Sequence, residues 1–209
     1  NIQLEYIMKH HYDAVFSDIG IIDRNGTIIN ESSIPVKIKK KYSQEMLRKL
    51  LFTRNIIATT TVLIKKESLL KAGLFNEEIY HAEDYELWLR LFGFKCKFGF
   101  LNMTLAYRRL HPGNNTGLMF VDEFNAEKDI SSSISRLFPE YLKHLRMRCA
   151  FLSTIRAKQE KDKGKHLISS LYYFKSLLLY PLPINGCKNR FLRAIAVMLY
   201  GCFIKINKF

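Results

Sequence analysis

The spacing of hydrophobic and polar residues changes near residue 119 of the 209-residue chain. Before this point, short runs of β-branched residues alternate with stretches of helical spacing, which predicts alternating strands and helices. The expected strands cover 13–22, 27–30, 56–65, 95–100 and 104–108. The expected helices cover 2–11, 43–52, 66–72 and 83–92. From residue 120 onward the spacing is helical, so we expect an α/β region over 1–118 and a helical region over 119–209.

Turn and cap residues punctuate the first region. Asn25-Gly26 lies between two apolar runs and predicts a β-hairpin with a type I′ turn, which needs positive φ at both central positions. Ser43 is a favourable N-cap for the helix that follows it. Gly73 is expected to end the helix before it as the C-cap. The basic stretch 37–41 is expected to be a loop.

Positive charge is concentrated in the C-terminal third. The net charge is +14, and residues 136–209 contain 15 Lys and Arg against 3 Asp and Glu. Such an excess indicates an anionic partner, either a membrane surface or a nucleic acid, or else a solvated helical face. Residues 188–208 mix basic with large apolar side chains, which is typical of a basic interfacial helix. The alternative is a helical cap on a catalytic domain.

The cysteines and the ends of the chain give less information about function. Cys96, Cys149, Cys187 and Cys202 show no C-x-x-C spacing, so we expect reduced thiols and neither a zinc site nor a disulfide framework. The longest uncharged apolar run, 194–204, has 11 residues and is too short to span a bilayer. The chain begins in helix-like sequence without Met, and we interpret it as a fragment of a longer protein; a trimmed complete domain is the alternative.

The most informative segment is AGLFNEEIYHAEDYELWLRL, residues 72–91. It places Glu83 and Asp84 at the expected start of a helix, where free backbone N–H groups favour carboxylates, and helix capping alone would explain the pair. Together with DAVFSDIGIIDRNGTII, IATTTVLIKK and AYRRLHPGNNTG, the segment resembles the signature of family 2 glycosyltransferases. Four segments agree in order and spacing, and the resemblance covers residues 1–118.

The resemblance implies a fold and an activity. The fold is the C-terminal part of a GT-A domain, which is Rossmann-like with a mixed sheet, followed by an α-helical tail. The activity is inverting transfer of a hexosyl-type sugar from a nucleotide sugar to a glycan or lipid-linked acceptor in cell-surface polysaccharide synthesis. Asp84 would be the general base that takes the proton from the acceptor hydroxyl. Glu83 would orient the site or bind the acceptor, unless it only caps the helix.

The resemblance also suggests residues on the acceptor side. Tyr85, Trp88 and His81 would lie there, and the indole of Trp88 would stack on a sugar. The position of Trp88 in an apolar helix face also suits core packing. Arg90 would face the diphosphate or pair with Glu86 at i, i+4.

On the donor side, the resemblance implies that Arg108 and Arg109 bind the diphosphate. His111 would bind Mn²⁺ or Mg²⁺, unless it is a solvent-exposed loop residue. The D-x-D motif that supplies the main metal ligands in this family does not occur in the chain. We therefore expect the donor-binding half to lie upstream of Asn1, and the fragment to be inactive by itself.

A non-catalytic basic module that binds a membrane surface or RNA is the competing hypothesis. RNA is disfavoured because the sequence has no RRM or KH motif and because Tyr172, Tyr173 and Phe174 are contiguous on an expected helix. We expect no nucleic-acid partner. The expected location is the cytoplasm, at the inner face of the cell membrane if the basic tail binds anionic lipid.

Overall fold

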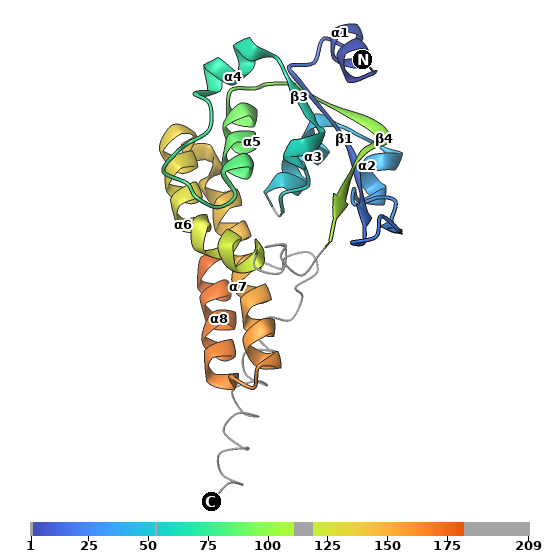
Figure 1. The fold of residues 1–209 in the computed structure, drawn as a ribbon. Coiled ribbons are helices and arrows are strands. Elements are labelled where there is room, and N and C mark those ends of the chain that lie inside the picture. Colours follow the sequence, from blue (N-terminus) through green and yellow to red (C-terminus); the bar gives the residue numbers. More distant parts are fainter. Residues whose placement is uncertain (1, 53, 111–118, 182–209) are drawn as a thin grey trace, which may run out of the picture. The chain divides into compact units, whose positions relative to one another are not determined.

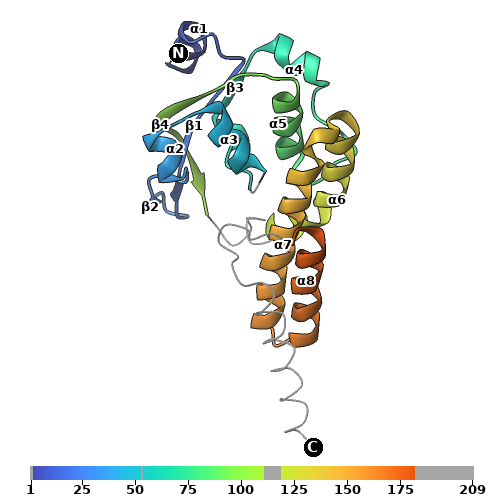
Figure 2. The ribbon, with the colours of Figure 1, turned by 180° about the vertical axis from the view of Figure 1, so that it is seen from behind.

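The structure, a computed structural model, describes residues 2–52, 54–110 and 119–181 (Figures 1 and 2). It divides into two compact units, Asn1–Pro139 and Glu140–Phe209. The elements are α1 (Ile2–Lys9), β1 (Ala14–Ile22), β2 (Ile28–Asn30), α2 (Val36–Lys40), α3 (Gln44–Leu51), η1 (Thr59–Thr61), β3 (Val62–Ile64), α4 (Lys66–Ala72), α5 (Glu83–Gly93), β4 (Phe98–Arg109), α6 (Met119–Leu137), η3 (Pro139–Tyr141), α7 (Leu142–Asp162) and α8 (His166–Leu179). Helix α6 belongs to the first unit, so the units divide later in the chain than the change in residue spacing.

Strand β1 is the centre of the sheet in the first unit (Figure 1). It pairs antiparallel with β3, with Phe16 opposite Val62, and antiparallel with β2, with Ile22 opposite Ile28. On its other edge it runs parallel to β4. The α/β fold with a mixed sheet and a helical C-terminal part, expected from the sequence, is confirmed.

The pairing of β1 with β4 is interrupted at Asp18. The register moves from Ser17 opposite Leu101 to Asp18 opposite Thr104, and then to Ile19 opposite Ala106. The pairing with β1 therefore skips residues of β4 on both sides of Thr104, which makes a β-bulge on each side. Bulges bend a strand and re-aim the side chains beyond them. They set the direction of the last part of β4, which lines the pocket described below.

Aromatic side chains fill the core beside β1 and β4. Phe98 stacks on Phe92 of α5 with ring centroids 4.6 Å apart, and it meets Trp88 edge-on at 6.4 Å. Phe16 and Phe100 lie 5.1 Å apart on the paired strands. Helix α5 is therefore fixed to the sheet by ring packing, which positions its N-terminus.

The expected cap residues of two helices are confirmed. Ser43 Oγ accepts a hydrogen bond of 3.1 Å from Met46 N at the start of α3. Gly73 ends α4 with φ of 89°, the left-handed conformation that glycine adopts without a Cβ clash.

The hairpin between β1 and β2 is present, but the predicted type I′ turn is wrong. Only Gly26 in the turn has positive φ, 92°. Gly26 N donates to Asp23 O at 3.2 Å, which makes a type I turn followed by a left-handed glycine. The reason is local: Asp23 Oδ1 accepts from the backbone N–H of Asn25 and Thr27, both at 2.8 Å, and this side chain fixes the turn.

Two other predicted elements also differ. The strand predicted over 56–65 is reduced to β3, because Asn55 and Thr61 satisfy backbone groups locally: Asn55 Oδ1 accepts from Ile57 N at 3.2 Å and Thr61 Oγ1 donates to Ala58 O at 2.8 Å. The two strands predicted over 95–100 and 104–108 are one strand, because pairing with β1 continues through the bulges.

The basic stretch predicted as a loop over 37–41 instead contains the short helix α2. Pro35 precedes it, and proline suits the start of a helix because its φ is already close to helical. Ile38 N donates to Pro35 O at 2.9 Å, which closes the first turn.

The second unit contains the antiparallel helices α7 and α8. Small polar side chains join them: Thr154 Oγ1 lies 2.9 Å from Ser176 Oγ, and Ser169 Oγ donates to Ala157 O at 2.6 Å. Among the helices of the described residues, none is both long and apolar enough to cross a membrane.

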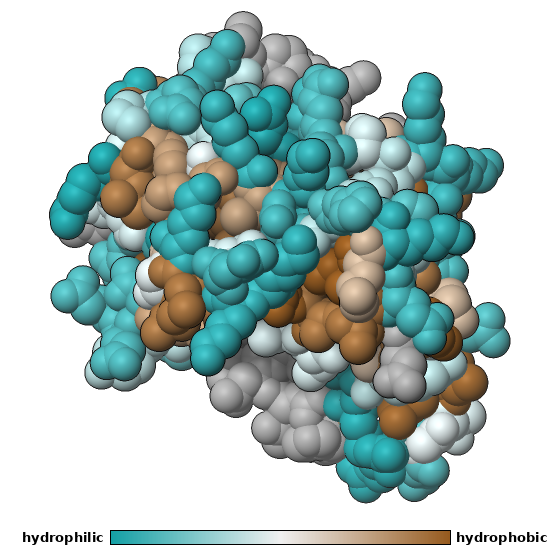
Figure 3. All heavy atoms as spheres, turned by 90° about the horizontal axis from the view of Figure 1, so that it is seen from above, coloured by the Kyte–Doolittle hydropathy of each residue, from teal (hydrophilic) through white to brown (hydrophobic). Residues whose placement is uncertain are grey.

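The face in Figure 3, which is seen from above relative to Figure 1, is mostly hydrophilic, with hydrophobic side chains in separate patches.

Candidate functional site

A pocket of about 410 Å³ lies where the N-terminus of α5, the segment before β3 and the end of β4 meet. Asp84 and Arg108 are the predicted site residues that line it. The other lining residues are Ile19, Ser33, Arg54, Asn55, Ile56, Ile57, Ala58, Thr59, Thr60, Ala106 and Tyr107. The pocket therefore combines a carboxylate, arginines, neutral hydrogen-bonding groups and an apolar wall.

Both carboxylate oxygens of Asp84 are held by hydrogen bonds. Oδ1 accepts from Asn55 Nδ2 at 3.1 Å and from Tyr85 N at 2.6 Å. Oδ2 accepts from Thr59 Oγ1 at 2.7 Å. The N-cap of α5 is Ala82, in a left-handed conformation with φ of 59°. Asp84 is thus inside the helix, and its side chain bonds the pocket loop as well as its own turn.

The surroundings of Asp84 change its acidity. Burial raises the pKa of its carboxyl above the usual value, and the negative charge of Glu83 adds to this. The hydrogen bonds from Thr59, Tyr85 and Asn55 act in the opposite direction without cancelling the effect of burial. A raised pKa makes the carboxylate a stronger base, which suits proton abstraction from a hydroxyl near neutral pH.

Sequence reasoning missed the loop that holds Asp84. Thr59 lies in the run predicted as a strand over 56–65, and Asn55 directly precedes that run, so neither side chain was expected to meet Asp84. The polar Asn55 between a helix end and an apolar run was the one available signal for a loop. Arg54, which lines the same pocket, was also missed.

Two predicted acceptor residues lie in the core. Trp88 is 2% exposed and packs on Phe98. Tyr85 is 0% exposed, and its hydroxyl donates to Leu51 O at 2.7 Å. Neither lines the pocket, so stacking of the Trp88 indole on a sugar does not fit this packing. Tyr85 instead ties α5 to the end of α3, immediately before the loop that contains Asn55.

The remaining acceptor-side residues are on the surface. Glu83 and His81 are exposed, and neither is among the described residues that line the pocket. Glu83 still affects the site, because its charge raises the pKa of Asp84.

The two predicted diphosphate-binding arginines are separated. Arg108 is half-buried and lines the pocket, and its Nε is buried with no hydrogen-bond partner among the described residues. Arg109 is exposed, and its Nη1 donates to Asp23 O at 3.1 Å and Arg24 O at 3.0 Å. Neighbouring residues of a strand point to opposite faces, which accounts for the separation.

Arg90 pairs with Glu86, which is one of the two roles that the sequence suggests for it; the other is to face the diphosphate. Its Nε lies 2.7 Å from Glu86 Oε2, and both side chains are buried. Ser133 Oγ of α6 donates to Glu86 Oε1 at 2.7 Å, and Arg90 Nη2 donates to Leu74 O at 2.6 Å. This network fixes the loop before α5 to the helix.

The predicted metal ligand His111 lies outside the described residues. Within the described part of the chain, no group of three or more His, Cys, Asp or Glu side chains is placed to hold a metal ion. Asp84 is the one carboxylate among the described residues that line the pocket. These residues alone do not fit Mn²⁺ or Mg²⁺, which bind several oxygen ligands, so the metal remains a prediction.

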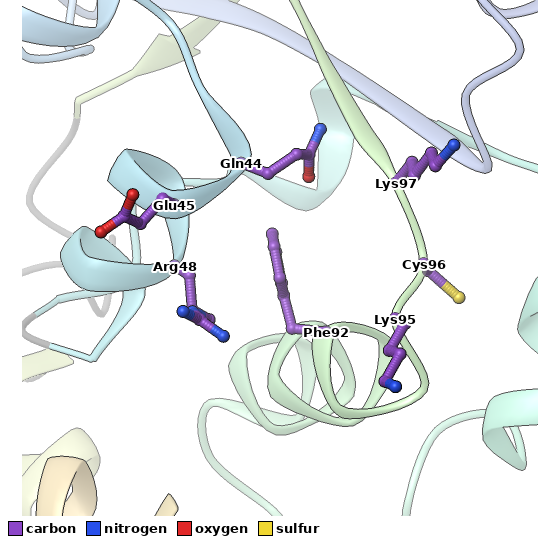
Figure 4. A pocket seen from close by; sticks show the side chains of 7 residues that line it. All are labelled: Gln44, Glu45, Arg48, Phe92, Lys95, Cys96 and Lys97. Atoms are coloured by element: carbon purple, nitrogen blue, oxygen red, sulfur yellow. The ribbon is translucent and has the colours of Figure 1, made fainter.

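A second pocket, of about 370 Å³, lies between α3 and the segment that leads into β4 (Figure 4). Phe92 points into it, with Gln44 and Arg48 on α3 and Lys95 on the other side (Figure 4). It contains none of the predicted site residues. Its cationic side chains, those of Arg48, Lys95 and Lys97, are exposed.

Comparison with known proteins gives two partial likenesses. No protein-family model matches the chain. An uncharacterized glycosyltransferase of Methanocaldococcus jannaschii is 25% identical over 114 residues, which are 54% of this chain and 37% of that protein. The O-antigen biosynthesis glycosyltransferase WbnJ of Escherichia coli is 31% identical over 93 residues, 43% of this chain and 32% of that protein. The chain spans about a third of the length of these curated relatives, and the likenesses support a glycosyltransferase role.

Proposed function

We propose that the chain is the acceptor-side, catalytic-base part of an inverting glycosyltransferase with a GT-A fold, of family 2. The observation that best supports this is Asp84, a carboxylate of raised pKa with both oxygens held by hydrogen bonds in the wall of a pocket. The donor is a nucleotide sugar. Because one similar protein is named for O-antigen biosynthesis, we propose a glycan or lipid-linked acceptor in polysaccharide synthesis.

Asp84 would act directly on the acceptor hydroxyl. A carboxylate has about four lone-pair positions, and Oδ2 accepts a single hydrogen bond from the described residues, that of Thr59. The acceptor O–H would donate to the remaining position. As its oxygen attacks the anomeric carbon, the proton passes to Asp84 and the bond from that carbon to the diphosphate oxygen breaks. Attack opposite the leaving group inverts the anomeric configuration.

Arg108 and Arg54 would face the charge that develops on the diphosphate. Both line the pocket that contains Asp84. A phosphate oxygen would give the buried Arg108 Nε the hydrogen-bond partner that the described residues do not supply. Arginine suits this role because its guanidinium stays protonated and can bind phosphate in a bidentate manner.

The test is Asp84→Asn in the natural gene product that contains these 209 residues. A panel of nucleotide sugars is screened for release of nucleoside diphosphate with a glycan extract as acceptor. We expect the substitution to lower kcat by at least about 100-fold with an unchanged circular dichroism spectrum, because the base is lost and the shape is kept. The matched control is Glu45→Gln, a surface carboxylate paired with Lys49. A kcat within a few-fold of the parent in both variants would refute the role of Asp84 as the general base.

We also propose that the helical C-terminal unit contacts an anionic membrane surface. Helix α8 exposes Leu167, Leu171 and Leu178, of which Leu178 is 88% exposed. Lys161 near the end of α7, and Lys163 and Lys165 in the turn that precedes α8, are exposed. Exposed apolar side chains beside basic ones favour an interfacial position at the inner face of the membrane. The basic tail beyond residue 181 lies outside the described residues.

Flotation with vesicles tests this contact, and RNA binding together with sugar transfer tests the competing hypothesis. We expect binding to phosphatidylserine vesicles but not to phosphatidylcholine vesicles, and we expect Leu171→Ser together with Leu178→Ser to weaken it. Binding to an RNA oligonucleotide of equal strength, together with no sugar transfer by the parent, would favour a non-catalytic basic module.

A further inference from the structure

Asp18 is a buried carboxylate outside the pocket. The inference drawn from it concerns the same site as the proposed function and rests on that function. It lies in the middle of β1, and its side chain is 1% exposed. We propose that Asp18 is a positioning residue that holds segment 31–34 in place as one wall of the pocket that contains Asp84.

The two oxygens of Asp18 contact different groups. Oδ1 accepts from the backbone N–H of Ser33 at 3.0 Å, of Ile34 at 3.1 Å and of Ile19 at 2.8 Å. Oδ2 accepts from Ser32 Oγ at 2.6 Å and pairs with Lys39 Nζ at 2.6 Å. Oδ1 therefore binds backbone groups, two of them in segment 31–34, whereas Oδ2 binds the Ser32 hydroxyl of the same segment and Lys39 of α2.

Segment 31–34 needs such a support because it is in neither a helix nor a strand. Backbone N–H groups without a ladder partner must find another acceptor, and Asp18 supplies one for two successive residues. Ser33 then lines the pocket, as does Ile19, which follows Asp18 in β1. From β4, Thr104 Oγ1 donates to Glu31 O at 2.8 Å and holds the other end of the segment.

The bulges of β4 lie directly opposite Asp18. Asp18 is opposite Thr104, with a register shift on each side. The same point of the sheet thus re-aims β4 toward the pocket and anchors the segment that faces it. A buried ion pair adds little net stability compared with apolar side chains of similar volume. Fixed geometry at the pocket wall is therefore the better reason for a charge at this position.

The experiment compares Lys39→Met with the double variant Asp18→Ala, Lys39→Met. The single variant removes the ion pair and leaves Oδ1 on the wall. The double variant removes both and leaves no unpaired buried charge, which favours folding. Amide hydrogen exchange is measured for residues 31–36 and for a control segment, 44–51. Initial rates are measured with the donor that the parent turns over.

We expect exchange of residues 31–36 to accelerate by about tenfold or more in the double variant and by less than about threefold in Lys39→Met, with 44–51 unchanged in both. The KM for the donor should rise about fivefold or more in the double variant, while kcat stays within about threefold of the parent because Asp84 is unchanged. Equal exchange in the two variants, faster exchange in both segments together, or an unchanged KM would overturn the proposal. Absence of turnover by the parent would refute the proposed function, and the exchange comparison would still decide whether Asp18 holds the wall.

Discussion

Thr59→Val tests whether the acidity of Asp84 controls the reaction. The substitution keeps the shape of the side chain and removes the hydroxyl that donates to Asp84 Oδ2 at 2.7 Å. A hydrogen bond to a charged group is worth about 1.5–3 kcal/mol, and one pKa unit corresponds to about 1.4 kcal/mol. Because Thr59 is exposed, we take the lower end, about 1.5 kcal/mol, as the contribution of this bond to the ionised form, and its loss is expected to raise the pKa of Asp84.

The direction of the pH effect follows from the role of the base. Asp84 can take a proton only when ionised, so activity falls as the pH drops through its pKa. A higher pKa therefore moves the acidic limb of the kcat/KM profile to higher pH, and at a fixed pH on that limb kcat/KM should fall by about tenfold relative to the parent. The control is Thr60→Val, which changes a residue of the same pocket for which no hydrogen bond to Asp84 is seen. An acidic limb that stays in place in Thr59→Val, with Asp84→Asn inactive, would refute this account of the pKa.

Three further results are expected. Arg108→Ala should raise the KM for the donor by about tenfold or more in an initial-rate assay, since it removes a charged hydrogen bond to the diphosphate. In the control Arg109→Ala, the KM for the donor should stay within about threefold of the parent, because the Arg109 guanidinium binds backbone carbonyls of the hairpin. Trp88→Ala should lower the unfolding free energy by about 3–5 kcal/mol in urea titrations, whereas Tyr80→Ala, at an 88% exposed site, should change it by less than about 0.5 kcal/mol. Asp84→Asn should have a Tm at pH 7 equal to or above that of the parent, and a clear decrease would contradict the raised pKa.

The sequence predicts most of the helices and the central strand well because their signals are local, although α2 lies in a stretch predicted as a loop. Ser43 and Gly73 sit at the helix ends they were expected to cap, and the run at β1 is long and apolar. The pocket was harder to predict because it depends on contacts distant in sequence. Asn55 lies 29 residues before Asp84, and nothing in its neighbours indicates that contact. Trp88 shows the reverse: an aromatic near a catalytic motif suggests stacking, but its face of α5 packs on Phe98.

Asp18 and Asp84 show how one residue type serves two purposes. Burial acts to raise the pKa of both, but at Asp18 the hydrogen bonds from Lys39, Ser32, Ser33 and Ile34 outweigh it and lower the pKa. A lowered folded pKa contributes stability that is present above the unfolded value, near 3.9, and is lost as pH falls through the folded one. Asp18 therefore stabilises the fold at neutral pH.

At Asp84 the balance has the opposite sign. Three hydrogen bonds do not compensate for burial, so the ionised form costs stability at pH values above the raised pKa. A carboxylate that weakens the fold in its charged state is a poor helix-capping device, but its charged state is the one a base requires. The contrast between the two aspartates thus favours a chemical role for Asp84, beside a wall that Asp18 holds in place.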